Sequence, residues 1–372
     1  MILSESELKK RKDEARESEI RQSVKNFCTN IRDGIRKNGS TSGNRAIWEL
    51  FQNACDVAKN DCGAEISIVL SNDSLVFSHK GKPFTFDSLS SLVKQVSSKE
   101  KENLVTVGQY GTGFLTTHKF NRKFTINGSM LISENPVAYV DINNYVINRE
   151  NFDDIPQFID DMTDQIMVVN NLMDAEQKEN AREWTEFKYE LNEERRLIAK
   201  TAIDEAIKLM PYVLTFNDKL EKCVITDKNR SKTYAFSKKD KTCSTEELRC
   251  KEIIVAEGGK GERSFFCYYL ETHEGDSRII LPLKTETEVC SFGDVPRLFV
   301  HFPLIGPNYF GVNFLFHSHR FTPEESRDNI IVPKDNDATT DIAEANRQVL
   351  SDMTKVLWQY LEKNVHLSLI HI

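Results

Sequence analysis

One segment, residues 44–59, constrains the fold most, because it has the pattern of a single amphipathic helix with an unusual polar side. At about 100° per residue, Glu49, Asn53 and Asp56 fall on one narrow stripe. The other side of the helix is broadly apolar and is formed by Ile47, Leu50, Phe51, Ala54, Val57 and Ala58. The carboxylate, carboxamide and second carboxylate of the stripe can activate a water molecule, hold Mg²⁺ and accept a hydrogen bond from a ligand. The alternative is an ordinary surface helix whose polar side faces water.

A second informative segment is the glycine-rich stretch at residues 105–114, which follows a polar, lid-like stretch at 97–103. Gly108, Gly111 and Gly113 leave backbone amides bare enough to approach a phosphate chain. Residues 115–118 are expected to continue as a helix whose amino end faces that phosphate. The stretch is not a Walker loop, because no Gly-Lys-Ser/Thr follows it. It is not a Rossmann fingerprint either, because no buried strand leads directly into it.

Composition limits the class of protein. A chain of 372 residues is expected to form two domains. Its 39% hydrophobic and 28% charged residues are typical of a soluble globular protein, and a net charge of −8 does not favour general binding to nucleic acid. The sequence has no apolar run of membrane-span length and no signal-peptide layout, and its eight cysteines form no CxxC pair. We therefore expect a cytoplasmic protein that does not bind membrane, and nucleic-acid binding is not indicated, although a local basic patch is left open.

The remaining patterns predict an α+β protein. Residues 5–37 read as a charged helix with a thin apolar stripe, which packs on its own domain or, alternatively, on a second subunit. Strands are expected at 64–70, 74–78 and 183–191 and at several places in 123–148, with helices at 86–96 and 193–214 and an acidic, irregular insertion at 149–182. The first domain would be residues 1–216. The second, residues 217–372, would be a smaller α+β domain that ends in a helix at 341–364.

Two histidines of the second domain, His317 and His319, alternate along an expected strand at 311–317 and just after it. Both rings would point to one face, which is a pattern that a metal site could use. With no carboxylate set nearby in the sequence, a structural role is the favoured interpretation.

Taken together, the residues Glu49, Asn53 and Asp56 and the glycine stretch Gly108-Gln-Tyr-Gly-Thr-Gly-Phe114 closely resemble two motifs of the GHKL ATPases. That superfamily includes gyrase, the ninety-kilodalton heat-shock chaperone, histidine kinases and mismatch-repair ATPases. The resemblance is strongest to the chaperone and sacsin-like branch. It implies a two-layer α/β sandwich, the Bergerat ATP-binding fold, followed by a transducer-like domain.

The resemblance also implies roles for individual residues. Glu49 would be the general base for the attacking water, Asn53 would give its carboxamide oxygen to Mg²⁺, and Asp56 would border the sugar and base of ATP. Thr185, in the expected strand at 183–191, would touch the adenine pocket. The backbone of the glycine stretch would wrap the phosphates under a lid at 97–113, and this set comprises Gly108, Gln109, Tyr110, Gly111, Thr112, Gly113 and Phe114.

The sequence departs from the family in the second motif, which is usually Asp-x-Gly-x-Gly. Gly81 is present, but His79 stands where the family has the aspartate that accepts a hydrogen bond from adenine. A neutral imidazole can still accept one hydrogen bond, although it lacks the charge. The departure puts adenine preference in question, and it resembles the histidine-containing motifs of bacterial sacsin-like proteins.

In related ATPases the second domain contributes a basic side chain to the γ-phosphate. Arg327 and Lys334 lie in a loop after an apolar strand, and Arg327 is the candidate catalytic residue. A surface ion pair is the alternative role for either residue.

These observations predict a Mg²⁺-dependent ATPase with slow hydrolysis, because lid closure and domain docking must assemble the site. Nucleotide binding would drive a conformational switch through homodimerisation. The protein would be a chaperone-like ATPase acting on a protein client, or a regulatory or antiviral-defence ATPase coupled to a C-terminal effector. The alternative is a nucleotide-binding switch with little or no turnover. A histidine kinase and a topoisomerase are disfavoured, since neither a phosphoacceptor setting nor a strand-passage module is present.

Overall fold

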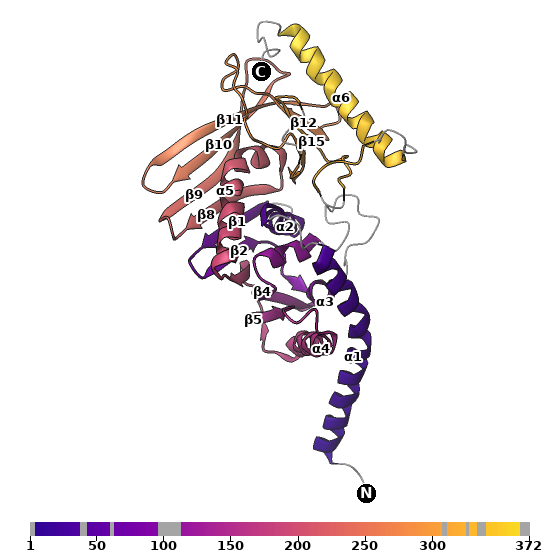
Figure 1. Cartoon of the computed structure of the whole chain (residues 1–372). Coiled ribbons are helices and arrows are strands. Elements are labelled where there is room, and N and C mark those ends of the chain that lie inside the picture. The colour runs from indigo at the N-terminus through magenta and orange to yellow at the C-terminus, as the bar shows by residue number, and fades with distance from the viewer. Residues whose placement is uncertain are drawn as a thin grey trace. The chain divides into compact units, whose positions relative to one another are not determined.

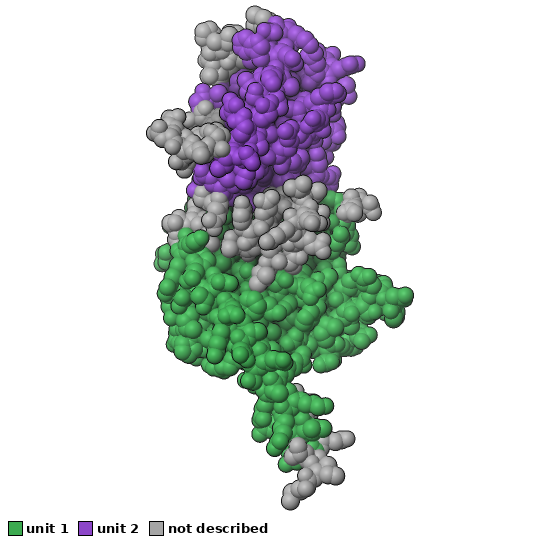
Figure 2. Space-filling view, turned by 90° about the vertical axis from the view of Figure 1, so that its right-hand side faces the viewer, with its two compact units in different colours: residues 1–202, 227–230 green, residues 203–226, 231–372 purple. Residues whose placement is uncertain are grey.

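The computed structural model describes residues 4–37, 43–59, 63–95, 113–306, 311–324, 327–332 and 340–364. The chain forms two compact units (Figure 2). Unit 1 comprises residues 1–202 and 227–230, and unit 2 comprises residues 203–226 and 231–372. The predicted boundary after residue 216 coincides with the end of helix α5 (Glu193–Phe216), whereas the division by contacts falls inside that helix.

Unit 1 contains a mixed sheet with the strand order β1-β2-β7-β4-β5-β6. Neighbouring strands in this order run antiparallel, and the short strand β3 pairs in parallel with β4. The strands are β1 (Ala64–Leu70), β2 (Ser74–Lys80), β3 (Phe84–Thr85), β4 (Lys123–Glu134), β5 (Val137–Asn148), β6 (Gln177–Lys178) and β7 (Trp184–Glu190).

Helices lie against this sheet, as Figure 1 shows. Helix α2 contacts β1 and β2, α3 contacts β4, and α4 contacts β5. The helical segments are α1 (Glu5–Lys37), α2 (Gly43–Asp56), α3 (Phe86–Lys94), the 3₁₀ turn η2 (Gly113–Lys119), α4 (Ile155–Asn171) and the 3₁₀ turn η3 (Leu172–Asp174). The helices and the mixed sheet confirm the predicted α+β sandwich.

The long helix α1 packs on its own unit through its C-terminal half. Val24, Cys28, Ile31 and Ile35 are buried at steps of three and four, and α1 contacts α4. The apolar stripe predicted for this helix is therefore used inside unit 1.

The prediction of an irregular insertion at 149–182 is wrong, because α4 occupies its centre. Asp154 caps this helix by accepting a hydrogen bond from the amide of Gln157 at 3.3 Å, and a proline stands in the first turn. Phe158, Met162 and Val169 are among its buried residues. The acidic composition hid an apolar stripe with helical spacing.

Helix α2 is fixed to the sheet by its apolar side. Phe51 is fully buried, with its ring centroid 5.2 Å from that of Trp48 on the same helix and 5.6 Å from that of Phe77 on β2. Such aromatic contacts have preferred geometries, so they fix the rotation of the helix about its axis. The rotation of α2 decides where Glu49 points.

Unit 2 has a sheet with the strand order β14-β13-β15-β12-β11-β10-β9-β8. Its strands are β8 (Leu220–Asp227), β9 (Lys232–Lys241), β10 (Arg249–Glu257), β11 (Gly261–Glu271), β12 (Ser277–Ile280), β13 (Leu298–Val300), β14 (Phe302–Pro303) and β15 (Leu315–Ser318). Helix α6 (Asp341–Lys363) packs on β11 and β12 over an apolar core that includes Leu281, Val349 and Met353.

One local feature of unit 2 differs from the pattern in the sequence. Residues 295–303 have the apolar pattern of a single strand, but His301 interrupts it between β13 and β14 with a φ of 61°. This left-handed conformation turns the chain back on itself, so that Val300 pairs with Phe302.

Among the helices of the described ranges, none combines the length and apolar character needed to cross a membrane.

The packing of α2 gives a first prediction. Leu50 is 1% exposed in α2 and Leu197 is 65% exposed in α5, so the same substitution can be compared at a buried and an exposed helical position. Leu50→Ala removes buried apolar surface and leaves a cavity, and we expect it to lower the free energy of unfolding by about 2–5 kcal/mol. Leu197→Ala is expected to change it by no more than about 0.5 kcal/mol. Urea denaturation of both variants measures the difference, and equal effects would contradict the burial of this face of α2.

Candidate functional site

The side chain of Glu49 is buried although it belongs to the polar stripe of α2. It is 5% exposed, and its Oε1 lies 3.7 Å from Nε of Arg45, one helical turn earlier. A carboxylate held in this way is not an ordinary solvent-facing helix residue, because removing a charge from water is costly unless it is paired.

Gly113 lies directly against this carboxylate. A Cβ atom at Gly113 would overlap Oε2 of Glu49 and lie 2.9 Å from its Cδ, so a larger residue there would displace the Glu49 carboxylate from this position. The hydroxyl of Thr116 donates to the carbonyl of Gly113 at 2.7 Å and that of Thr117 donates to the carbonyl of Phe114 at 2.8 Å. These bonds stabilise η2, which begins at Gly113 where a helix from residue 115 was expected. The structure thus brings the end of the glycine-rich stretch onto the polar stripe of α2.

Gly81 lies against the carboxyl end of the same helix. A Cβ atom there would be 2.8 Å from the carbonyl oxygen of Val57, and the amide of Lys82 donates to that oxygen at 2.8 Å. The second motif is therefore fastened to the residue that follows α2. Close packing explains the need for glycine at this position without reference to a ligand.

His79 and Thr185 face each other across neighbouring strands. They are register partners in the pairing of β2 with β7, and both side chains are buried. The His79 ring stacks on Phe187 with a centroid distance of 6.2 Å, and Phe187 also contacts the ring of Phe114 at 5.8 Å. One aromatic side chain thus links the second motif to the end of the glycine stretch.

His79 is neutral at physiological pH. Burial lowers the pKa of the imidazole to about 4, and an interaction with the backbone of Lys80 opposes this shift in part. Within the described part of the chain, Nδ1 of His79 is buried and makes no hydrogen bond. A buried polar atom without a partner calls for an explanation, and a bound ligand is one.

The other two members of the polar stripe, Asn53 and Asp56, are partly exposed on the same helix as Glu49. Mg²⁺ prefers oxygen ligands, and the carboxamide oxygen of Asn53 one turn from the Glu49 carboxylate has the right donor chemistry. The residues present therefore fit the cation that the resemblance implies.

Several predicted site residues lie outside the described residues or in unit 2, apart from the residues on and around α2. Gly108, Gln109, Tyr110, Gly111 and Thr112 lie outside the described residues, as do the lid residues 97–112 and Lys334. Arg327 is in unit 2, where its amide donates to the carbonyl of Glu324 and its own carbonyl accepts from the amide of Ile305. Its approach to a phosphate stays a prediction.

Sequence reasoning missed Arg45 and Phe187. Arg45 had a usable signal, because residues four apart on a helix are neighbours and an Arg–Glu pair at this spacing is favourable. Phe187 had none, since its contacts with His79 and Phe114 depend on strand pairing between distant segments.

Comparison with known proteins adds similarity to solved structures alone. No protein-family model matches the chain, and no curated protein matches it. Among solved structures, the chain is similar to the 43K ATPase domain of Thermus thermophilus gyrase B in complex with an aminocoumarin, with a TM-score of 0.28 and 12% sequence identity. The match covers 57% of this chain and 56% of that domain, so it spans little more than half of either. A likeness of this size does not establish a shared family or activity.

The buried His79 predicts a pH-dependent stability. Its pKa is about 4 in the folded chain and near 6.5 when unfolded, so between these values the unfolded state binds more protons. The free energy of unfolding therefore falls as pH drops through this window, and the contribution of His79 is fully present above about pH 6.5. Between pH 7.5 and 4.5 we expect wild type to lose about 2–3 kcal/mol more than His79→Gln.

Urea denaturation at the two pH values tests this expectation, and the other histidines cancel in the comparison with the variant. The exposed His273 offers a control, because His273→Gln should keep the wild-type profile. If the free energy of unfolding changed equally with pH in wild type and His79→Gln, burial would not be keeping His79 neutral.

Proposed function

We propose that unit 1 binds ATP with Mg²⁺ and hydrolyses it slowly. The proposal combines the motif resemblance with the way the described parts of those motifs converge. Glu49, Gly81 and Gly113 come from three separate segments of the sequence, and all three lie on or against helix α2 and the residue that follows it. Such convergence is what a nucleotide site built from these motifs requires.

One observation carries the proposal, namely the contact of Gly113 with the Glu49 carboxylate. Phosphoryl transfer to water needs a base beside the phosphate chain, in a site from which bulk water is excluded. The buried carboxylate supplies the base, and the bare backbone at Gly113 supplies the close approach. A glycine loop elsewhere on the surface, or an exposed Glu49, would not support this reaction.

In this proposal Glu49 accepts the proton of the attacking water. Arg45 is a positioning residue, because its guanidinium lies 3.7 Å from the carboxylate and restrains its direction. Asn53 would hold Mg²⁺, which when bound supplies positive charge to the phosphate oxygens. Asp56, at the end of α2, is proposed to border the sugar.

The base of the nucleotide is assigned to the side of the sheet where His79 and Thr185 face each other. The neutral imidazole has one nitrogen that accepts and one that donates, and Nδ1 is unpaired in the described ranges. Adenine presents both a donor and an acceptor on its amino edge. We therefore propose that His79 replaces the usual carboxylate as the hydrogen-bonding partner of the base, with Thr185 beside it.

The finer function is proposed on the resemblance alone. Closure of the 97–113 lid and the approach of Arg327 from unit 2 would complete the site, and two copies of the chain would dimerise in the ATP state. The conformational change would then be passed to a protein client, as in a chaperone, or to an effector in a regulatory or defence ATPase.

The alternative proposal is a nucleotide-binding switch with little or no turnover. The neutral His79 favours this alternative. Without a carboxylate in the adenine pocket, the nucleotide is positioned less firmly, and hydrolysis depends on that positioning. The two proposals differ only in the rate of hydrolysis, so turnover separates them.

Substitution of the proposed base gives the direct test. Glu49→Gln keeps the shape of the side chain and removes its ability to accept a proton, and we expect turnover to fall about 10²- to 10⁴-fold. ATP affinity, measured by calorimetry, should stay close to wild type. Glu17→Gln, the same change at an exposed position of α1, is the matched control and should leave both quantities unchanged.

Three outcomes are informative. Unchanged turnover in Glu49→Gln with ATP still bound would refute the assignment of the base. Measurable binding with no turnover in wild type would favour the switch. Loss of binding in Glu49→Gln would contradict the expected wild-type affinity and show that the carboxylate helps to hold the ligand.

A further inference from the structure

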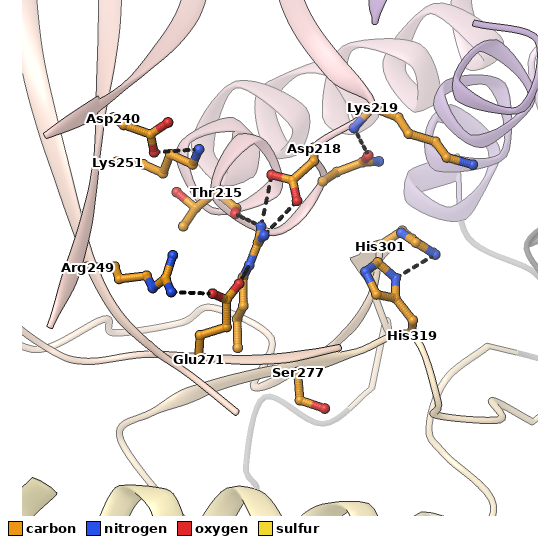
Figure 3. Close-up of polar contacts among 12 residues, drawn as sticks. Thr215, Asp218, Lys219, Asp240, Arg249, Lys251, Glu271, Ser277, His301 and His319 are labelled. Atoms are coloured by element: carbon orange, nitrogen blue, oxygen red, sulfur yellow. Dashed lines mark hydrogen bonds and ion pairs between the residues drawn. The ribbon is translucent and has the colours of Figure 1, made fainter. Parts of the chain in front are cut away.

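Three histidines of unit 2 converge at one place outside the candidate nucleotide site. His301 lies between β13 and β14, His317 is in β15, and His319 follows that strand. One ring nitrogen from each lies within 4.8 Å of the others. Figure 3 shows the rings of His301 and His319 turned toward each other.

The strand pairing explains this convergence. Strands β13 and β15 run parallel, and Phe299 is the register partner of His317. His301 and His319 each come two residues after this pair, just beyond the ends of the two strands, so the pairing delivers both to the same edge. The sequence pattern indicates only the pair of His317 and His319, because His301 belongs to a separate segment.

His317 gives the strongest evidence that the cluster binds a ligand. It is 1% exposed, and neither of its ring nitrogens makes a hydrogen bond within the described part of the chain. Phe216 stacks on the ring with a centroid distance of 5.0 Å and an interplanar angle of 16°, which fixes its plane. Two unsatisfied nitrogens on a buried ring are rare in proteins, and an unseen ion is a recognised cause.

The geometry of the other two rings is close to that of metal ligands. Nε2 of His301 and Nδ1 of His319 share a hydrogen bond of 3.1 Å, which a bound ion would replace, and the His317 and His319 ring centroids are 4.7 Å apart at 89°. Ligands about 2.0–2.1 Å from a tetrahedral Zn²⁺ are about 3.4 Å from one another, so small ring rotations suffice. The left-handed backbone of His301, with its φ of 61°, is what turns its ring toward the pair.

The surroundings keep the imidazoles in the form that binds metals. Burial is the main cause that lowers the pKa of each ring, to about 3 for His301, so all three are neutral near pH 7. The nearby Arg278 is paired with Asp218 at 2.6 Å and with Glu271 at 3.0 Å, which offsets its charge. Lys219 and Arg327 also contribute to the lowered pKa of His301.

We propose that His301, His317 and His319 form a binding site for a divalent transition-metal ion of the Zn²⁺ type. An all-imidazole donor set favours Zn²⁺, Cu²⁺ or Ni²⁺ over Mg²⁺, which prefers oxygen. Three protein ligands leave a fourth position for water, since Asp218 is already engaged by Arg278. All three histidines belong to unit 2, whereas Glu49, His79 and Gly113 of the candidate nucleotide site belong to unit 1.

The test is titration of the chelator-treated, nucleotide-free chain with Zn²⁺, followed by calorimetry and by thermal unfolding. We expect one Zn²⁺ per chain and a raised Tm, and Co²⁺ in its place should give the visible absorption of a tetrahedral site. His301→Gly removes a ligand at a position where glycine tolerates the backbone conformation. His319→Ala removes an exposed ligand, so neither variant is expected to unfold the chain.

Each ligand variant should weaken Zn²⁺ binding by at least the roughly 10- to 100-fold that loss of an outer-shell partner costs. His273→Ala, at an exposed histidine outside the cluster, should bind as wild type does. Absence of Zn²⁺ binding to the wild-type chain would overturn the proposal. Binding that is unchanged in both His301→Gly and His319→Ala would overturn it as well, by placing the ion elsewhere. Because ATP is absent throughout, failure of the nucleotide proposal does not affect the result.

Discussion

The packing of helix α2 on its sheet is the constraint on which the candidate nucleotide site depends. Phe51 lies between Trp48 and Phe77 and fixes the rotation of the helix. That rotation directs the polar stripe toward the segment that begins at Gly113, so Glu49 is buried on the side that an ordinary surface helix would give to water. Because α2 is covered on both sides, the Glu49 carboxylate is removed from water. The contact with Arg45 offsets part of the desolvation cost of this carboxylate.

Buried polar groups mark the places in both units where a ligand would act. In unit 1, Glu49 is buried beside Arg45, and Nδ1 of His79 has no partner in the described ranges. In unit 2, both ring nitrogens of His317 are buried and make no hydrogen bond within the described ranges. Each site is assembled by strand pairing: β2 with β7 brings Thr185 to His79, and β13 with β15 brings the third histidine to the other two. The two proposed sites differ in donor chemistry, since oxygen atoms are the candidate ligands in unit 1 and imidazole nitrogens are the candidate ligands in unit 2.

Much of the fold could be predicted from local patterns, and the failures have physical causes. Apolar periodicity was sufficient for α2, β1 and β7, because one face of each is buried in regular steps. It failed for α4, whose acidic residues concealed the stripe, and at His301, where a single left-handed residue divides an apolar run. The contact of Gly113 with Glu49 joins residues far apart in the sequence, and only the motif resemblance implied it. The roles of residues 108–112 and Arg327 stay predictions.

The central claim is that the motifs on α2 form a nucleotide site, and thermal unfolding with ligand tests it most directly. The purified chain would be heated with ATP, with and without Mg²⁺, and with GTP as the control. A ligand bound only to the folded state stabilises it by about 2.7 kcal/mol at a hundredfold excess over Kd. We predict a rise in Tm with ATP that is larger with Mg²⁺ and absent with GTP. No rise at millimolar ATP would contradict the claim, and an equal rise with GTP would contradict the assignment of His79 to the adenine base.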